Sequence, residues 1–209
     1  GTKFRGSYAT GFRAPTINDL FFPDASNPNL KPEKSRSMDI GVDQKFLEDK
    51  LLLSGGFFWN RFQELIQLDT AFIPQNIGNA KIQGWEYGLQ YAIFKNLNFR
   101  GQYTHILTRN LDNGNRLARR PVDQASAGLS YQPFEPLRVN ADYRFVGARD
   151  DDAANTAARN LPSFNVIDVS ATYDVTRQWQ IFGRVDNLFD RNYEEVFHFG
   201  APTRRVAAI

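Results

Sequence analysis

Three consecutive acidic residues, Asp150, Asp151 and Asp152, are the most compact group of potential metal ligands in the 209-residue sequence. Carboxylate oxygens are ligands that Ca²⁺ takes in proteins, usually together with carbonyl or amide oxygens and a further Glu at spaced positions. The run lacks those spaced oxygens. We therefore interpret it as a solvated charge cluster on a loop, with calcium binding as the alternative, and we expect no metal site.

Arginines cluster shortly before that acidic run. Arg116, Arg119 and Arg120 carry guanidinium groups, which bind phosphate and carboxylate in a bidentate manner. They would attract an anionic ligand or the phosphate of lipopolysaccharide. Because Arg119 and Arg120 also open a segment that reads as a strand, a role at the rim is at least as well supported as substrate binding.

Enzymatic chemistry has little support in the sequence. Cysteine is absent, and the two histidines are His105 and His198. His105 alternates with Tyr103 and Leu107 on an apolar face, which favours an interfacial position over that of a general base. No GxSxG, HExxH or phosphate-binding glycine motif occurs. We expect neither an enzyme nor a cofactor.

Aromatic side chains gather in segments that read as loops, including Phe21, Phe22, Tyr193 and His198. They would suit a large planar or apolar ligand such as a corrin, but loops also pack on one another, and the sequence leaves both readings open. The candidate ligand-binding residues on loops are Phe21, Phe22, Arg116, Arg120, Asp150, Tyr193 and His198.

The elements that would position these residues are strands, because apolar and polar residues alternate along most of the chain. Residues 137–145 and 167–175 show the alternation most clearly. Segments of about 10–12 residues match the ~9–11 residues of a tilted strand that crosses a membrane. About ten strands are predicted, at 2–12, 38–46, 51–67, 85–93, 97–108, 125–131, 137–145, 167–175, 179–189 and 205–209.

The connections between these strands alternate strictly between long and short. The short ones fall at 47–50, 95–96, 133–136 and 176–178, and the long ones at 12–34, 68–79, 109–121, 148–161 and 190–202. In an up-and-down antiparallel sheet, successive connections lie at opposite ends. All long connections would therefore share one end, as they do in transmembrane β-barrels.

The two faces of the strands differ in chemistry. One face is apolar and carries aromatics such as Trp59, Trp85 and Tyr143, which favours contact with lipid and an interfacial girdle. The alternative is the core of a soluble β-sandwich. In the membrane interpretation the charged face lines a lumen, where acids and bases would pair or meet a domain that fills it. The predicted lumen-facing or plug-facing residues are Glu86, Arg100, Asp142, Arg144, Asp168, Arg184 and Asp186.

Composition excludes several classes of protein. Lys and Arg number 25 against 23 Asp and Glu, a net charge of +2, which argues against a nucleic-acid-binding protein. Apolar runs are too short for a transmembrane helix of about 20 residues.

Several strings resemble one family in order and spacing. Residues 8–21 read YATGFRAPTINDLF, 27–33 read NPNLKPE, 82–86 read IQGWE, 119–131 read RRPVDQASAGLSY, and 187–194 read NLFDRNYE. They resemble the C-terminal half of the barrel in TonB-dependent outer-membrane receptors. The last segment is most similar to the cobalamin-receptor branch, although siderophore receptors share much of it.

The resemblance implies a 22-stranded barrel in the outer membrane of a Gram-negative bacterium, with a plug domain inside. Residues 1–209 would be the last ten strands, without the plug and the first strands. The function implied is active import of a scarce nutrient, with cobalamin or a corrinoid ahead of a ferric siderophore, energised by TonB through the plug. Membrane lipid and lipopolysaccharide would surround the barrel. The alternatives are a small pore or rim-active enzyme built from ten strands, and a soluble β-sandwich binding module.

Overall fold

The computed structural model describes residues 1–69, 71–76, 78–201 and 203–208. Ten strands form one antiparallel sheet in which each strand pairs with its neighbours along the chain, in the order β1-β2-β3-β6-β7-β8-β9-β12-β13-β16. In the described ranges, no helix has the length and apolar character needed to cross a membrane. The predicted all-β, up-and-down antiparallel architecture is confirmed.

The ten strands follow the predicted alternation closely. Their bounds are β1 Thr2–Arg13, β2 Glu33–Phe46, β3 Leu51–Gln63, β6 Asn79–Phe94, β7 Leu97–Asn110, β8 Asp123–Phe134, β9 Leu137–Val146, β12 Phe164–Asp174, β13 Gln180–Asp186 and β16 Arg205–Ala208. Two predicted strands began too late, because β2 begins at Glu33 and not at 38, and β6 at Asn79 and not at 85. Two others were too long at one end. β3 ends before Glu64, and β13 ends before Asn187. Both of these residues have a positive φ, which interrupts extended backbone.

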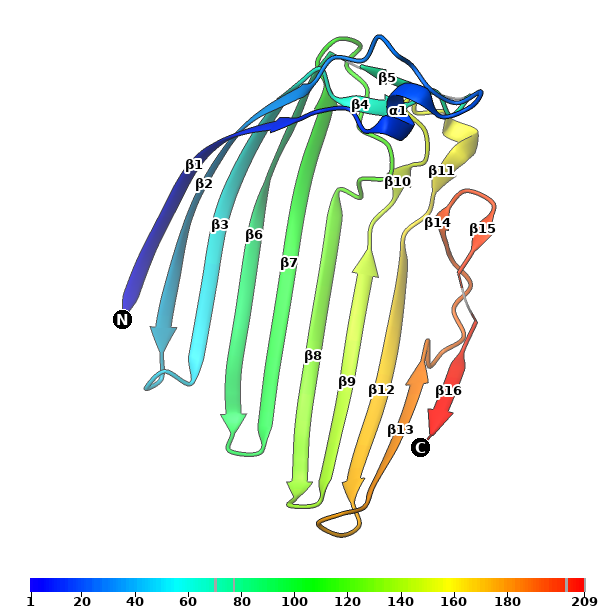
Figure 1. Cartoon of the computed structure of the whole chain (residues 1–209). Coiled ribbons are helices and arrows are strands. Elements are labelled where there is room, and N and C mark those ends of the chain that lie inside the picture. The colour runs from blue at the N-terminus through cyan, green and yellow to red at the C-terminus, as the bar shows by residue number, and fades with distance from the viewer. Residues whose placement is uncertain (70, 77, 202, 209) are drawn as a thin grey trace.

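The long connections gather at one end of the sheet and the short turns at the other, as predicted (Figure 1). The long connections contain the small elements. These are α1 Ile17–Phe21, β4 Ile66–Leu68, β5 Pro74–Asn76, β10 Arg149–Asp150, η1 Ala157–Arg159, β11 Asn160–Leu161, β14 Glu194–Val196 and β15 Phe199–Gly200. Helix α1 begins with a capping box, in which the Thr16 hydroxyl accepts from the Asp19 N–H and the Asp19 carboxylate accepts from the Thr16 N–H.

The sheet has an outer face, on the side of Tyr87 and Tyr173, and an inner face, on the side of Arg100 and Asp142. Large apolar side chains on the outer face are open to the surroundings, and Phe4 is 81% exposed. An exposed apolar face of this extent suits lipid and not water. Other exposed apolar residues on this face include Tyr8, Ile40, Trp85, Leu107, Leu129, Tyr131, Ile181 and Val206.

The buried core lies among the long connections and the strand ends beneath them. Leu117, Leu161 and Phe164 are almost fully buried there, and so is Pro74 of β5. A sheet with lipid on one face and a lumen on the other has no such core of its own. The loops are therefore packed against one another and form an ordered rim.

The ten strands form an open sheet. Within the residues that the structure describes, β1 pairs with β2 alone and β16 with β13 alone, so the two edge strands do not meet. Figure 1 shows the N- and C-terminal strands at opposite edges of the curved sheet.

Candidate functional site

The inner face is crossed by ion pairs that reach over a glycine. Arg100 on β7 and Asp142 on β9 lie two strands apart and are joined above Gly128 of β8. A Cβ on Gly128 would lie 2.6 Å from Arg100 Nε and 2.9 Å from the Asp142 carboxylate. The missing side chain therefore leaves the space that the pair occupies.

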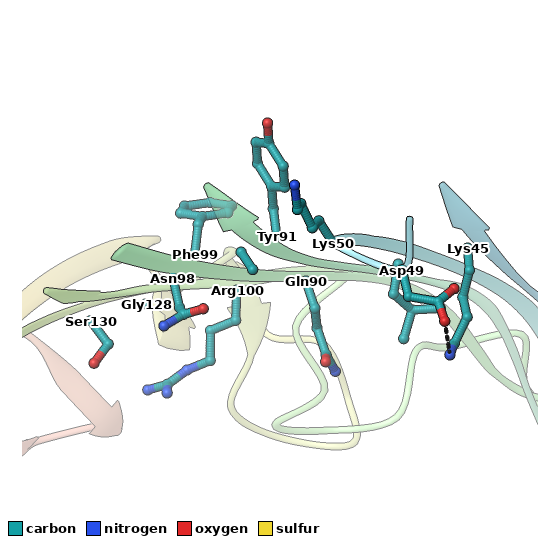
Figure 2. Close-up of a pocket in the computed structure, with 12 residues that line it drawn as sticks. Lys45, Asp49, Lys50, Gln90, Tyr91, Asn98, Phe99, Arg100, Gly128 and Ser130 are labelled. Atoms are coloured by element: carbon teal, nitrogen blue, oxygen red, sulfur yellow. Dashed lines mark hydrogen bonds and ion pairs between the residues drawn. The ribbon is translucent and has the colours of Figure 1, made fainter. Parts of the chain in front are cut away.

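This part of the inner face lies beside a depression of about 390 Å³ close to the short turns. Figure 2 shows Arg100, Asn98 and Gln90 on one side of the sheet, and Tyr91 and Phe99 on the other. The separation of polar and aromatic side chains is the one that the alternation predicts.

Glu86 occupies a second depression on the inner face, together with Arg5 of β1. The residues in register between them are Gly41 on β2 and Gly56 on β3, so the Arg5 side chain lies across two glycines. Arg5 Nη2 is 3.7 Å from Asp43. Basic and acidic groups therefore also alternate on β1, β2 and β6, whereas the other predicted lumen residues lie on β7, β9, β12 and β13.

Five predicted residues meet beneath the last long connection, in what we call the inner-rim site. It is a depression of about 160 Å³. Arg184 lies 3.9 Å from Asp168 and also bonds Asp186, while Asp168 accepts the backbone N–H of Asn187 at 2.8 Å. The inner-rim site is lined by Arg144, Asp168, Arg184, Asp186, Tyr193 and Arg205.

Arg144 connects the inner-rim site to the β14–β15 hairpin above it. Its guanidinium donates to Glu195 at 3.0 Å and to the Tyr193 hydroxyl at 3.2 Å. The Tyr193 ring stacks on Phe164 with centroids 4.1 Å apart, and Arg149 donates to the carbonyl of Glu194 at 2.9 Å. Cationic, anionic and aromatic groups thus converge where a connection meets the lumen. Groups of these kinds are the ones that form charge-assisted hydrogen bonds and stacking contacts.

Asp151 is the centre of a second cluster, which joins three connections. Its carboxylate has no exposed surface and accepts from Arg119 Nε at 2.9 Å, from Arg159 Nη2 at 3.1 Å and from the Phe197 N–H at 3.3 Å. Burial opposes ionisation of Asp151, but the hydrogen bonds from Arg119 and Phe197 and the two arginine charges outweigh it and lower its pKa. The cluster of Asp151, Arg119, Arg159 and Phe197 is called the loop hub below.

The prediction that the three aspartates form a solvated run is therefore wrong for Asp151. Asp152 bonds the Thr156 N–H at 3.0 Å, and Asp150 lies 3.9 Å from Arg116. Each carboxylate faces an arginine or a backbone donor. Asp150 and Asp151 pair with other connections, and Asp152 pairs within its own.

Contacts continue along all five long connections in sequence order. Asn27 in the first donates to the carbonyl of Pro74 in the second at 3.1 Å. Asp112 in the third accepts at 2.9 Å from the backbone N–H of Asn79, the first residue of β6 directly after the second. The loop hub then joins the third, fourth and fifth connections. The connections therefore form one continuous rim.

The remaining predicted loop residues lie apart from the inner-rim site. Phe21 and Phe22, at the end of α1, are exposed, and the structure gives no hydrogen bond or ion pair to Arg120 among its described residues. Arg116 and Asp150 face each other between the third and fourth connections. His198 is at the tip of the β14–β15 hairpin, with its ring 4.0 Å from that of Phe197.

Sequence reasoning missed several residues of the inner-rim site and its surroundings. Phe164 and Arg149 fall outside the predicted strands, and no motif distinguishes them. Arg205 lies on the inner face because it pairs with Asp186. The alternation of polar and apolar residues in the last strand was the one sequence signal that could have placed Arg205 on the inner face.

His105 lies on the outer face, in agreement with the predicted interfacial position. Its Nδ1 is 2.8 Å from Asp123, which also accepts from the Tyr103 hydroxyl at 2.6 Å. The motif glycine of IQGWE, Gly84, lies on the inner face, where a Cβ would be 2.2 Å from the His105 carbonyl oxygen.

Comparison with known proteins agrees with this architecture. Residues 1–188 match the family described as "TonB dependent receptor-like, beta-barrel". "Vitamin B12 transporter BtuB" of Photobacterium profundum is 34% identical over 203 residues, which are 91% of this chain and 32% of that protein. The protein of the same name from Vibrio vulnificus is 31% identical over 209 residues, which cover 95% of this chain and 32% of that protein. The chain thus spans about a third of the length of these relatives.

Solved structures share the fold at lower identity. "Copper transporter OprC" superposes with a TM-score of 0.81 at 22% identity, covering 97% of this chain and 35% of its own. The ferric enterobactin receptor PfeA of Pseudomonas aeruginosa has a TM-score of 0.81 at 17% identity. The superposition covers 100% of this chain and 38% of the receptor. With an antiparallel sheet that carries an apolar outer face, a charged inner face and one rim of long connections, the chain belongs to the TonB-dependent receptor β-barrel family of Gram-negative outer membranes.

Proposed function

We propose that the protein containing this chain is an outer-membrane receptor that actively imports a scarce nutrient, energised through TonB. Cobalamin or a related corrinoid is the favoured substrate, and a ferric siderophore is the next. The observation that carries this proposal is the 34% identity to a vitamin B12 transporter over 91% of the chain. No enzymatic activity is part of the proposal.

In this proposal, residues 1–209 form the C-terminal part of the barrel, and a plug domain lies against the inner face. The paired charges of that face suit a surface that contacts another folded domain, because their partners already compensate most of the charge. Glu86, Arg100, Asp142, Asp168, Arg184 and Asp186 would contact the plug.

The ligand would be captured by the rim above. Phe21, Phe22 and His198 offer exposed rings for a planar ligand, while Arg116, Arg120 and Asp150 offer charge. Tyr193 and Arg144 lie where the rim meets the lumen and would be the first inner-face residues that a descending ligand contacts.

The alternative of a passive ten-stranded pore has less support, because the sheet is open between β1 and β16 in the described residues. A soluble sandwich would need a second sheet over the apolar outer face. The ten long strands form a single sheet, and the two-stranded sheets belong to the long connections.

Titration of the purified full-length receptor with cyanocobalamin and, separately, with ferric siderophores tests the proposal. We expect saturable binding of cyanocobalamin in the nanomolar to micromolar range and no competition by siderophores. Binding of a siderophore alone would identify a ferric siderophore as the substrate in place of cobalamin. Binding of neither would contradict the proposed function.

A further inference from the structure

Four basic side chains form a row across neighbouring strands on the outer face. Arg36 on β2 is in register with Arg61 on β3, Arg61 with Lys81 on β6, and Lys81 with Arg109 on β7. Arg36, Arg61 and Arg109 lie two positions along their strands from Met38, Trp59 and Leu107. Side chains two positions apart share a face, so the row is on the lipid-facing side. Arg36, Arg61, Lys81 and Arg109 are called the outer basic row.

Within the described residues, no acidic side chain pairs with the positive charges of the row. In the part of the chain that the structure describes, none of the four has a carboxylate within 4 Å or a side-chain hydrogen bond. Like charges directly opposite one another on adjacent strands destabilise a sheet. On the inner face, in contrast, Arg100, Arg138 and Arg144 each have an acidic partner.

The row lies at the rim end of the sheet. Arg36 is three residues after the start of β2, and Arg109 is one residue before the end of β7. The next residues toward the middle on this face are Met38, Trp59, Gln83 and Leu107, three of which are suited to lipid and its interface. Because long connections of transmembrane barrels are extracellular, the row lies at the level of the outer-leaflet headgroups.

A groove of about 420 Å³ adjoins the row and gives a ligand a place to lie. Arg36 and Arg61 line it, with a fifth cation, Lys34, and with the exposed ring of Phe12 beside them. A cationic groove with an apolar wall matches a molecule that carries phosphate on an apolar body.

Asp123, an acid on the same face, is already engaged. Asp123 on β8 bonds the Tyr103 hydroxyl and His105, two same-face positions below Arg109. It therefore does not neutralise the row.

We propose that the outer basic row binds the phosphate groups of a phosphorylated lipid in the outer leaflet, with the acyl chains against the apolar face below. Guanidinium and ammonium groups bind phosphate by charge-assisted hydrogen bonds, and arginine does so with two parallel bonds. Lipid phosphate would offset the repulsion along the row. This site is separate from ligand import and from the inner-rim site.

The test measures lipid binding to the full-length receptor in detergent by native mass spectrometry, with bisphosphorylated lipid A and with its dephosphorylated form. The variant carries Arg36→Gln, Arg61→Gln, Lys81→Gln and Arg109→Gln. The control removes the same number of cations near the short turns, by Lys3→Gln, Lys50→Gln, Lys95→Gln and Arg177→Gln. Heat-modifiable migration in gels reports barrel folding in each.

We expect the row variant to bind the bisphosphorylated lipid at least about tenfold more weakly, since losing one charge-assisted bond has an effect of about that size. The control should bind like the parent, and the parent should prefer the phosphorylated lipid. Equal binding by parent and row variant, or of both lipids by the parent, would overturn the proposal. Displacement of lipid by millimolar inorganic phosphate would also overturn it, since it would indicate a simple anion site.

Should the fourfold variant fail to fold, the single variant Arg61→Gln takes its place. Its neighbours on both sides in the row are cations, so a threefold or greater loss of phosphorylated-lipid binding is expected. No loss in this variant would contradict the proposal.

Discussion

At Gly84, the glycine of the IQGWE motif, the absence of a side chain permits close packing of the sheet. A Cβ there would lie 2.2 Å from the His105 carbonyl oxygen and 2.7 Å from the ring of Phe58. The carbonyl belongs to the neighbouring strand and cannot move without disturbing the β6–β7 pairing. The motif residue thus has a structural reason that requires no ligand.

Gly84→Ala is therefore expected to lower the free energy of unfolding by about 1–3 kcal/mol, the usual cost of overpacking. Gly88→Ala is the matched control on the same strand and face, because its Cβ would make an ordinary contact at 3.4 Å with Ser54. Urea unfolding of the full-length receptor in lipid vesicles measures both. Equal stabilities of the two variants would show that the close approach at Gly84 is relieved at no cost.

Asp151 is the second residue whose removal has a defined consequence. Asp151→Asn keeps its shape but removes the charge that faces Arg119 and Arg159. We expect the connections to be destabilised by roughly 1–3 kcal/mol, less than the ~3–5 kcal/mol of a fully buried pair, because both guanidinium groups are nearly half exposed. Asp24→Asn is the control, at an exposed position whose carboxylate has no ion pair or hydrogen bond among the described residues.

The pH dependence of the loop hub follows from the lowered pKa of Asp151. A carboxylate whose pKa is lower in the folded state contributes stability that is fully present above the unfolded value of about 3.9. That contribution is lost as the pH falls through the lowered folded value. Protease protection of residues 147–163 should therefore persist from pH 7 to about pH 4 and decline below it. A decline that is the same in Asp151→Asn would assign the acid sensitivity to other groups.

At the scale of elements, the five long connections act as one rim, because each contacts the next in sequence order. The β14–β15 hairpin depends on Arg144, which reaches it from the inner face of β9. A ligand that binds the hairpin would therefore alter the contacts of Arg144 in the inner-rim site.

Arg144→Ala should loosen the hairpin, which keeps its contacts with Arg149 and Asp151, while leaving the strands paired. We expect amide exchange of residues 193–200 to rise about tenfold or more, because loss of a charge-assisted hydrogen bond costs ~1.5–3 kcal/mol. Arg138→Ala is the control, because it lies on the same strand and face and pairs with Asp174 near the short turns. Hydrogen exchange with mass spectrometry reads both, and equal protection of the hairpin in the two variants would contradict the role of Arg144.

At the scale of the whole molecule, the sequence predicted the sheet well because period-two alternation and loop length are local signals. Residues 137–145 and 167–175 became β9 and β12 with few shifts. The loop hub was not predictable in the same way. Asp151, Arg119 and Phe197 are far apart in sequence and meet through packing of connections, which leaves no periodic pattern. The ends of β3 and β13 were missed because a positive φ at Glu64 and Asn187 has only a weak sequence signal.

We propose that this sheet belongs to a receptor that imports a corrinoid with energy from TonB. Uptake of radiolabelled cyanocobalamin tests it directly, in cells that lack their own receptor and express the full-length protein, with and without TonB. We predict accumulation above the surface-bound amount in cells with TonB, and surface binding alone in cells without it. Accumulation that is independent of TonB, or no uptake in either strain while the protein is folded in the outer membrane, would contradict the account.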